Sequence, residues 1–134
     1  MPIKEYRKLF KSTGVDLHSR KPSPEALLRR VITGKGTYNI NTAVDAYNIA
    51  VMETGVGLGG FDTDKLKSAV CLRFSKVGES MLLLGDNEPT ILKEGELVYA
   101  TCNGPITLDL NYRDIDDTKI TEKTKNILLF ADGA

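Results

Sequence analysis

The spacing of apolar residues changes once along this chain, from a helical period before Gly60 to an alternating period after it. The helical part predicts three helices, each followed by a glycine that can adopt the left-handed conformation of a helix end. These helices contain residues 3–10 before Gly14, 27–32 before Gly34 and 44–51 before Gly55. Ser23 is predicted to cap the second helix and Asn41 the third. Because helices come first and short strands follow, we predict an α+β domain.

Five strands are predicted in the second half of the chain. Residues 69–74 alternate, with Val70, Leu72 and Phe74 on one side, which predicts a strand with one buried face. Residues 81–84 are continuously apolar, which is typical of a strand covered on both sides. The remaining strands are predicted at residues 97–101, 106–110 and 127–130, between turns rich in glycine and asparagine.

Size and composition exclude several classes of protein. The 134 residues suit a single domain spanning residues 1–134. No apolar run approaches the ~20 residues of a membrane helix, and the N-terminus lacks the pattern of a secretory signal. We therefore expect a cytoplasmic protein with no membrane partner. One histidine and two cysteines are too few for a zinc site without a recruited carboxylate, so we expect no metal.

A run of glycines matches the spacing of a dinucleotide-binding fingerprint through Gly55, Gly57 and Gly60. That fingerprint needs a strand before it and a helix after it, whereas a predicted helix precedes these glycines. We therefore expect no nicotinamide or flavin cofactor. The glycines indicate instead a tight turn or a close approach of a ligand to the backbone.

Basic residues are concentrated near the N-terminus. Residues 1–40 carry nine lysines and arginines against three acidic residues, and the rest of the chain carries nine against fifteen. Such a segment can contact the phosphates of a nucleic acid without reading its sequence. The alternative is that these charges only solvate the outer faces of two helices.

Three polar residues of the third helix recur at intervals of four and three residues: Asn41, Asp45 and Asn48. This spacing places them along one helical face, just before the glycine-rich segment. They can line a polar pocket, although capping and buried hydrogen bonding explain them equally well.

Several blocks of the chain, in order, resemble the tRNA-binding and editing domain (the B-three/B-four domain) of the phenylalanyl-tRNA synthetase β subunit. These blocks are PSPEALLRR at 22–30, INTAVDAYN at 40–48, GGFDTDKL at 59–66, GELVYA at 95–100, NYRD at 111–114 and TKITEKTKN at 118–126. The similarity runs from about Tyr6 to Phe130 and is greatest to the free-standing relatives of that domain. It implies an α+β fold with N-terminal helices packed on a mostly antiparallel, β-sandwich-like core.

The resemblance also implies an activity. In the synthetase this domain hydrolyses tyrosine wrongly esterified to the phenylalanine tRNA, so we expect this chain to hydrolyse a mischarged aminoacyl-tRNA in trans. Asp45 or Asn48 would orient the water as catalytic residues. The pocket would include Asn41, Gly59, Gly60 and Asp62, with the backbone amides of the two glycines stabilising the oxyanion. Arg29, Arg30 and Lys35 would contact tRNA phosphates, and DNA is not an expected partner.

Three departures from the family pattern are present, and the two at the family's tyrosine-recognising positions keep tyrosine specificity out of this expectation. Gly59 stands where bacterial editing domains have a histidine, and Phe130 stands where they have a glutamate. Asp109 and Leu110 replace an arginine–tryptophan pair of the free-standing relatives. Two alternatives therefore stay open: a non-catalytic tRNA-binding module with a degenerate pocket, and a pocket for a free amino acid or another small metabolite.

The resemblance also bears on the extent of the chain. Free-standing members have a further β-rich stretch before the first predicted helix and a helical tail after the last strand. We therefore expect a trimmed chain, a short gene product or a degenerate copy of the domain. A trimmed chain would leave strand edges unpaired, and it would self-associate through them.

Overall fold

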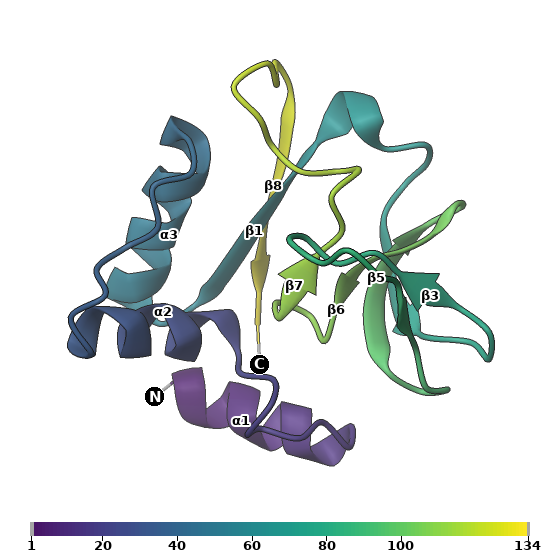
Figure 1. Cartoon of the computed structure of the whole chain (residues 1–134), viewed down its shortest axis with the longest axis horizontal. Coiled ribbons are helices and arrows are strands. Elements are labelled where there is room, and N and C mark those ends of the chain that lie inside the picture. The colour runs from purple at the N-terminus through teal and green to yellow at the C-terminus, as the bar shows by residue number, and fades with distance from the viewer. Residues whose placement is uncertain (1, 134) are drawn as a thin grey trace.

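The computed structural model describes residues 2–133 and has the predicted α+β architecture. The helices are α1 (Pro2–Ser12), α2 (Ser23–Ile32) and α3 (Thr42–Thr54), and a short 3₁₀ helix η1 (Thr63–Lys65) follows the first strand. Figure 1 shows the three helices gathered on one side of the molecule and most of the strands on the other. No helix within the described residues is long and apolar enough to cross a membrane.

The ends of the helices follow the sequence signals, with one exception. Asn41 caps α3, because its side chain accepts a hydrogen bond from the Val44 backbone N–H at 3.0 Å. Gly55 ends α3 with a left-handed φ of 72°. The prediction for Ser23 is wrong: it is the first residue of α2, and its N–H donates to the Asn111 side chain at 3.0 Å. A side chain 88 residues away therefore satisfies the start of this helix.

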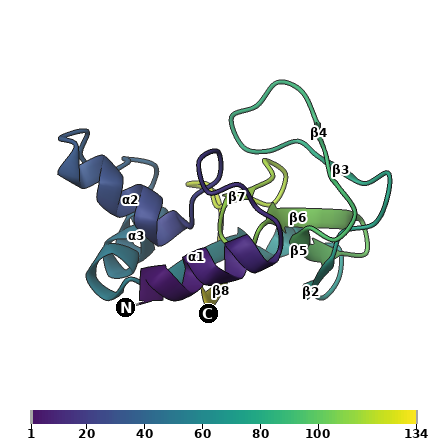
Figure 2. The same cartoon turned by 90° about the horizontal axis from the view of Figure 1, so that it is seen from below.

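In the part of the chain that the structure describes, the strands form three small antiparallel sheets. A pair joins β1 (Gly57–Asp62) to β8 (Ile127–Asp132), and a second pair joins β3 (Ser80–Met81) to β4 (Thr90–Ile91). The largest sheet has the order β2 (Cys71–Phe74), β5 (Leu97–Thr101), β6 (Gly104–Leu108) and β7 (Arg113–Asp114). Figure 2 shows that β3 and β4 lie at the end of the molecule opposite α2 and α3.

The structure corrects which strand faces are buried. Leu72 and Phe74 of β2 are 50% and 60% exposed, because no layer formed by residues 2–133 covers this face of the edge strand. Residues 81–84 are covered on one side only, since Met81 and Leu83 are buried while the two leucines that alternate with them are exposed. The strand predicted at 97–101 is confirmed as β5.

The main core lies between the large sheet and the β3–β4 pair. It is made of six buried side chains: Met81, Leu83, Leu92, Val98, Ala100 and Leu108. Val98 and Leu108 are cross-strand partners on β5 and β6, and both are fully buried. Burial of apolar surface here is the main source of stability for the β half of the domain.

A buried tyrosine ties α1 to the end of the β1–β8 pair. The Tyr6 hydroxyl donates to the backbone carbonyl of Asp132 and accepts from the backbone N–H of Gly57 at 2.9 Å. Gly57 and Asp132 are cross-strand partners, so the hydroxyl bridges the last rung of the β1–β8 ladder. The first helix and the last strand are thereby joined through one side chain.

We expect Tyr6→Phe to lower the free energy of unfolding by about 1–3 kcal/mol, because it leaves two buried backbone groups without their partner. Urea denaturation followed by circular dichroism measures this change. Tyr38→Phe is the matched control, since Tyr38 is half exposed and should lose less than about 0.5 kcal/mol. Equal stability of the Tyr6→Phe variant and the unmodified protein would contradict the bridging role.

Candidate functional site

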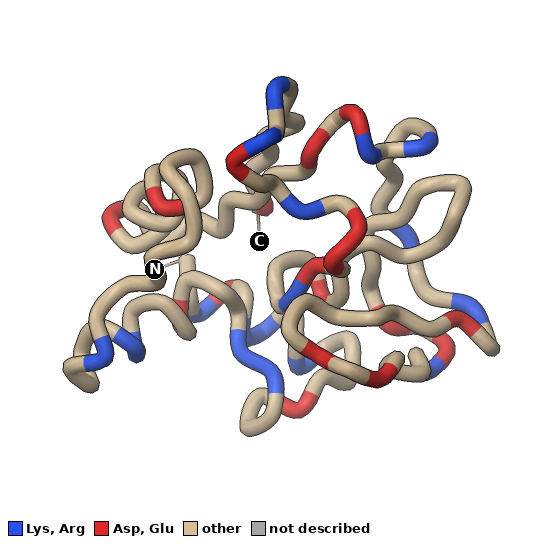
Figure 3. The backbone as a smooth tube through the Cα atoms, turned by 45° about the horizontal axis from the view of Figure 1, so that its top comes forward, with Lys and Arg blue, Asp and Glu red and all other residues tan. Residues whose placement is uncertain are grey.

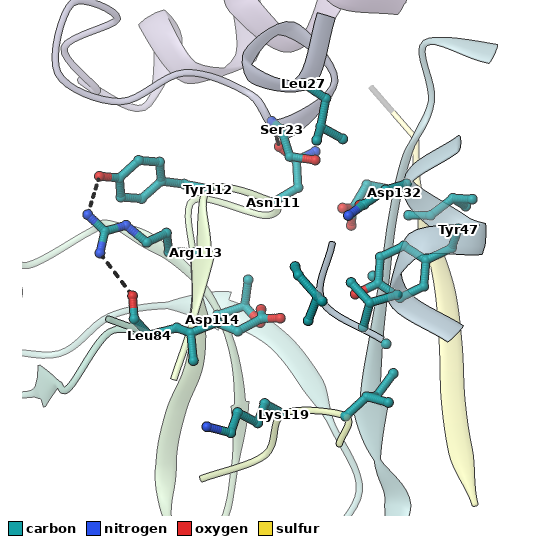
Figure 4. Close-up of a pocket in the computed structure, with 18 of the residues that line it drawn as sticks. Ser23, Leu27, Tyr47, Leu84, Asn111, Tyr112, Arg113, Asp114, Lys119 and Asp132 are labelled. Carbon is teal, nitrogen blue, oxygen red and sulfur yellow. Dashed lines mark hydrogen bonds between the residues drawn. The ribbon is translucent and has the colours of Figure 1, made fainter. Parts of the chain in front are cut away.

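A cavity of about 580 Å³ lies between the helices and the strands. Its walls come from α2, α3, β1, β8 and the segment at residues 107–114 (Figure 4). The apolar part of the wall consists of Leu27, Val44, Tyr47, Leu58, Leu110, Ile120 and Phe130. The polar part includes Asn48, Thr107, Asn111, Asp114, Lys119 and Asp132. An apolar cavity with a few convergent polar groups is the usual form of a small-molecule site.

Some of the predicted pocket residues meet in this cavity and others do not. Asn48, Gly59 and Gly60 line it. Asn41 and Asp45 line a neighbouring hollow of about 470 Å³, which shares Ile40 and Ile120 with the cavity. The helical face predicted from the sequence is therefore divided between two adjacent depressions.

The polar groups outside the cavity have structural partners. Asn41 caps α3 and also donates to the Ile120 carbonyl at 3.1 Å. Asp45 accepts from the Ile40 backbone N–H at 2.9 Å. Asp62 is buried beside neither hollow; it caps η1 through the Asp64 N–H at 3.1 Å and accepts from Thr124 at 2.7 Å. These three residues hold the loops around the site in place.

Gly59 and Phe130, the two residues that replace the family's histidine and glutamate, face each other in the structure. They are cross-strand partners on β1 and β8. The Phe130 ring lies over Gly59 so closely that a Cβ at position 59 would come within 2.4 Å of it. Phe61 and Tyr99 hold this ring, with centroid separations of 5.1 and 5.0 Å. The phenylalanine therefore occupies space above β1 that the glycine leaves open.

Asp109 and Leu110, the third departure from the family pattern, have an unusual backbone conformation. Both residues have a left-handed φ, of 53° and 63°, so β6 ends at Leu108 and not at residue 110 as predicted. Asp109 is buried and pairs with Arg20 at 3.0 Å. Burial raises the pKa of Asp109 to about 6, against the opposing effect of Arg20. This turn aims Leu110 and Asn111 at the cavity.

The predicted RNA-contacting residues lie on α2 and the loop after it. Arg29 pairs with Glu25 through a 2.8 Å contact, and the Arg30 guanidinium stacks over the Tyr38 ring at 4.1 Å. Lys35 is exposed in the loop. Figure 3 shows lysine and arginine positions in blue over several parts of the backbone, including the helical side of the molecule. Tyr38 also lines the cavity, so this basic region adjoins the cavity wall.

Sequence reasoning missed the two carboxylates that face the cavity. Asp114 lies on β7 and Asp132 at the end of β8. Burial raises the pKa of each to about 6. No local pattern joins them, because residues 114 and 132 lie on strands of two different sheets.

Comparison with known proteins places the chain in a family. A family model described as the B3/4 domain matches residues 5–134. The phenylalanine–tRNA ligase beta subunit of Synechocystis sp. is 34% identical over 115 residues, which is 81% of this chain and 14% of that protein. The subunits of the same name from Nocardia farcinica and Hahella chejuensis are 34% and 30% identical over 89% and 87% of the chain.

The chain spans about 14% of the length of these relatives. The matched region includes every wall of the cavity. The chain belongs to the B3/4 domain family.

Proposed function

We propose that this domain binds aminoacyl-tRNA and hydrolyses a wrongly attached amino acid in trans, inside the 580 Å³ cavity. The observation that carries the proposal is the convergence of Asn48, Gly60 and Asn111, from three separate family-like blocks, on one cavity. The names of the relatives, which are subunits of a tRNA ligase, support a tRNA ligand.

Hydrolysis of an aminoacyl ester needs a donor for the oxyanion. The Asp62 N–H donates to the Thr118 carbonyl at 3.0 Å and so points away from β8. Because N–H directions alternate along a strand, the N–H of Gly60 lies on the same free edge of β1, whereas that of Gly59 faces β8. We therefore assign the oxyanion contact to the Gly60 amide.

The reaction also needs an oriented water. Asn48 lines the cavity from α3, and its amide makes no side-chain hydrogen bond to residues 2–133. It is our proposed water-orienting catalytic residue. Asp45 holds the backbone of Ile40, a residue of the cavity wall, and we propose that it acts by positioning that wall.

We expect Asn48→Ala to slow loss of the ester by about 100-fold, because a group that orients the attacking water is removed. The protein is incubated with a panel of mischarged tRNAs, and the remaining aminoacyl-tRNA is counted over time. Ile49→Ala is the control on the same helix, since Ile49 is exposed and outside the cavity. An unchanged rate for Asn48→Ala would refute its assignment.

Removing the basic charges of Arg29, Arg30 and Lys35 should make tRNA binding less dependent on salt. The slope of log K against log salt is negative, and each lost phosphate contact makes it less steep by about 0.7–0.9. The slope of the triple alanine variant should therefore be less steep by about 2–3. Binding is measured by filter retention between low and moderate salt. Lys76→Ala/Lys93→Ala, on exposed residues of the β half, is the control and should keep the slope. An unchanged slope in the triple variant would exclude this surface.

A second function, tRNA binding without hydrolysis, is favoured by one observation. The Phe130 ring lines the cavity and lies over Gly59, next to the proposed oxyanion contact at Gly60, so closely that no Cβ fits at position 59. Retention of tRNA with no loss of ester across the whole panel would support this alternative over the leading proposal.

A further inference from the structure

Two carboxylates face the cavity from different strands, that of Asp132 buried and that of Asp114 partly buried. Asp114 accepts a hydrogen bond from the Thr107 hydroxyl at 2.6 Å, and Asp132 accepts one from the Tyr99 hydroxyl. Figure 4 shows the Asp114 carboxylate pointing from β7 toward the side of the cavity formed by Asp132 and Tyr47. Asp132 is only 3% exposed, and within residues 2–133 its Oδ2 atom makes no hydrogen bond of good geometry. The Asn111 amide lies close to this oxygen beside Gly57 and acts on it as a donor, which lowers the pKa of Asp132 against the effect of burial.

Neither carboxylate is neutralised by a cation within residues 2–133. The cations of the cavity wall are Arg113 and Lys119, and these pair with Asp86 at 2.8 Å and Asp116 at 2.6 Å. Figure 4 shows the Arg113 guanidinium turned toward Leu84 and away from Asp114.

The remaining titratable groups beside the two carboxylates are phenols. They are Tyr6 of α1, Tyr47 of α3 and Tyr99 of β5. Burial raises the pKa of all three, and that of Tyr47 to about 12, so they are neutral at pH 7. Asp114 and Asp132 are therefore the only charges in their surroundings within the described chain that lack a counter-ion.

This arrangement is unfavourable without a ligand. The hydroxyl hydrogen bonds of Thr107 and Tyr99 replace only part of the hydration that the two carboxylates lose, and no cation supplies the rest. The charge of Asp132 further disfavours the charge of Asp114. A bound ammonium group would compensate both charges and would donate charge-assisted hydrogen bonds to the carboxylate oxygens. The apolar wall around Leu27, Leu58 and Tyr47 suits an attached hydrocarbon group.

We propose that Asp114 and Asp132 bind the α-ammonium group of the aminoacyl ester, an inference that rests on the proposed function. The same charges repel a carboxylate, so the subsite selects an ester over a free amino acid. Hydrolysis adds water to the ester, breaks the acyl C–O bond and releases the amino acid as a carboxylate, the tRNA as its hydroxyl and one proton to the solvent. The product then carries a negative charge beside two others, which favours its release.

The test uses amino-acid amides, which keep the ammonium group and cannot be hydrolysed as esters. Leucinamide, phenylalaninamide and tyrosinamide are titrated at pH 7 and followed by NMR chemical shifts. We expect at least one to bind, and its N-acetyl derivative and free amino acid to bind at least about tenfold more weakly, which corresponds to one unpaired charge contact. Asp132→Asn and Asp114→Asn should each lower the affinity for the amide about tenfold, whereas Asp117→Asn, at an exposed neighbour, should not.

The pH dependence gives an independent readout. The free carboxylates have pKa values of about 6, so binding should weaken below pH 6 as they become neutral. It should weaken again above about pH 7.7, where an α-amino group loses its proton. An affinity for the amide that is greatest near pH 7 supports binding of the ammonium group by the two carboxylates. An affinity that stays constant from pH 5 to 7 overturns it.

Stability separates loss of binding from loss of folding. A carboxylate whose pKa is higher in the folded than in the unfolded protein destabilises the fold once pH rises through that pKa. Asp132→Asn and Asp114→Asn should therefore melt at least as high as the unmodified protein at pH 7.5, while binding the amide less well.

The outcomes also separate this inference from the proposed function. Equal binding of the amide and its N-acetyl derivative, unchanged affinity in both variants, or no binding of any amide would each overturn the ammonium subsite. The proposed hydrolysis is tested separately by ester loss from mischarged tRNA, and none of these binding results decides it.

Discussion

Leu108→Ala is expected to lower the free energy of unfolding by about 2–5 kcal/mol. Leu108 is fully buried at the centre of the core between the large sheet and the β3–β4 pair. The truncated side chain would leave a cavity that its neighbours on three strands cannot fill. A domain of this size has a total stability of about 5–15 kcal/mol, so this single change removes a large share of it.

Urea denaturation measures this loss as a shift of the midpoint at unchanged slope. Leu72→Ala is the matched control, because Leu72 lies on β2 of the same sheet but is 50% exposed. It should change stability by less than about 0.5 kcal/mol. Similar losses for the two variants would show that the core is placed wrongly.

Gly59→Ala is expected to destabilise the protein by about 1–3 kcal/mol, although alanine suits a strand better than glycine does. The new methyl group would lie 2.4 Å from the Phe130 ring, which is held by Phe61 and Tyr99 and cannot move aside freely. In a Phe130→Ala background the space is open, and Gly59→Ala should then be nearly neutral.

The four proteins of this double-mutant cycle are compared by urea denaturation. A coupling of at least about 1 kcal/mol is expected between positions 59 and 130. Additive effects, within about 0.5 kcal/mol, would mean that the packing of the Phe130 ring does not require glycine at position 59.

The local features of the fold could be predicted from the sequence. The three helices, the Asn41 cap and the glycine at the end of α3 depend on neighbouring residues, and the structure contains all of them. The burial of strand faces could not be predicted in the same way. Alternation in β2 shows that one face is apolar, but only the neighbouring layers decide whether that face is covered.

Only part of the candidate site could be predicted from the sequence. Asn48 and Gly60 lie in recognisable blocks, and the structure brings them to one cavity. Asp45 was grouped with them by helical spacing, but its carboxylate binds the Ile40 N–H and faces the neighbouring hollow. The role of each as a site residue stays a prediction.

The long-range features of the site could not be derived from spacing at all. The sequence shows Gly59 and Phe130 as two independent departures, whereas the β1–β8 register makes them partners. The carboxylate pair of Asp114 and Asp132 depends on the same pairing, which no short-range pattern encodes.

The β1–β8 ladder also sets when the cavity can form during protein synthesis. Its register joins Gly57 to Asp132, so one wall of the cavity comes from the middle of the chain and another from β8. Contacts between such distant segments form late, because the entropy of closing a long loop is lost before the contacts can stabilise the chain. While β8 is still inside the ribosome, the emerged chain contains the three helices and β1 but no closed cavity. The edge of β1 that pairs with β8 is then free, and a chaperone can bind it.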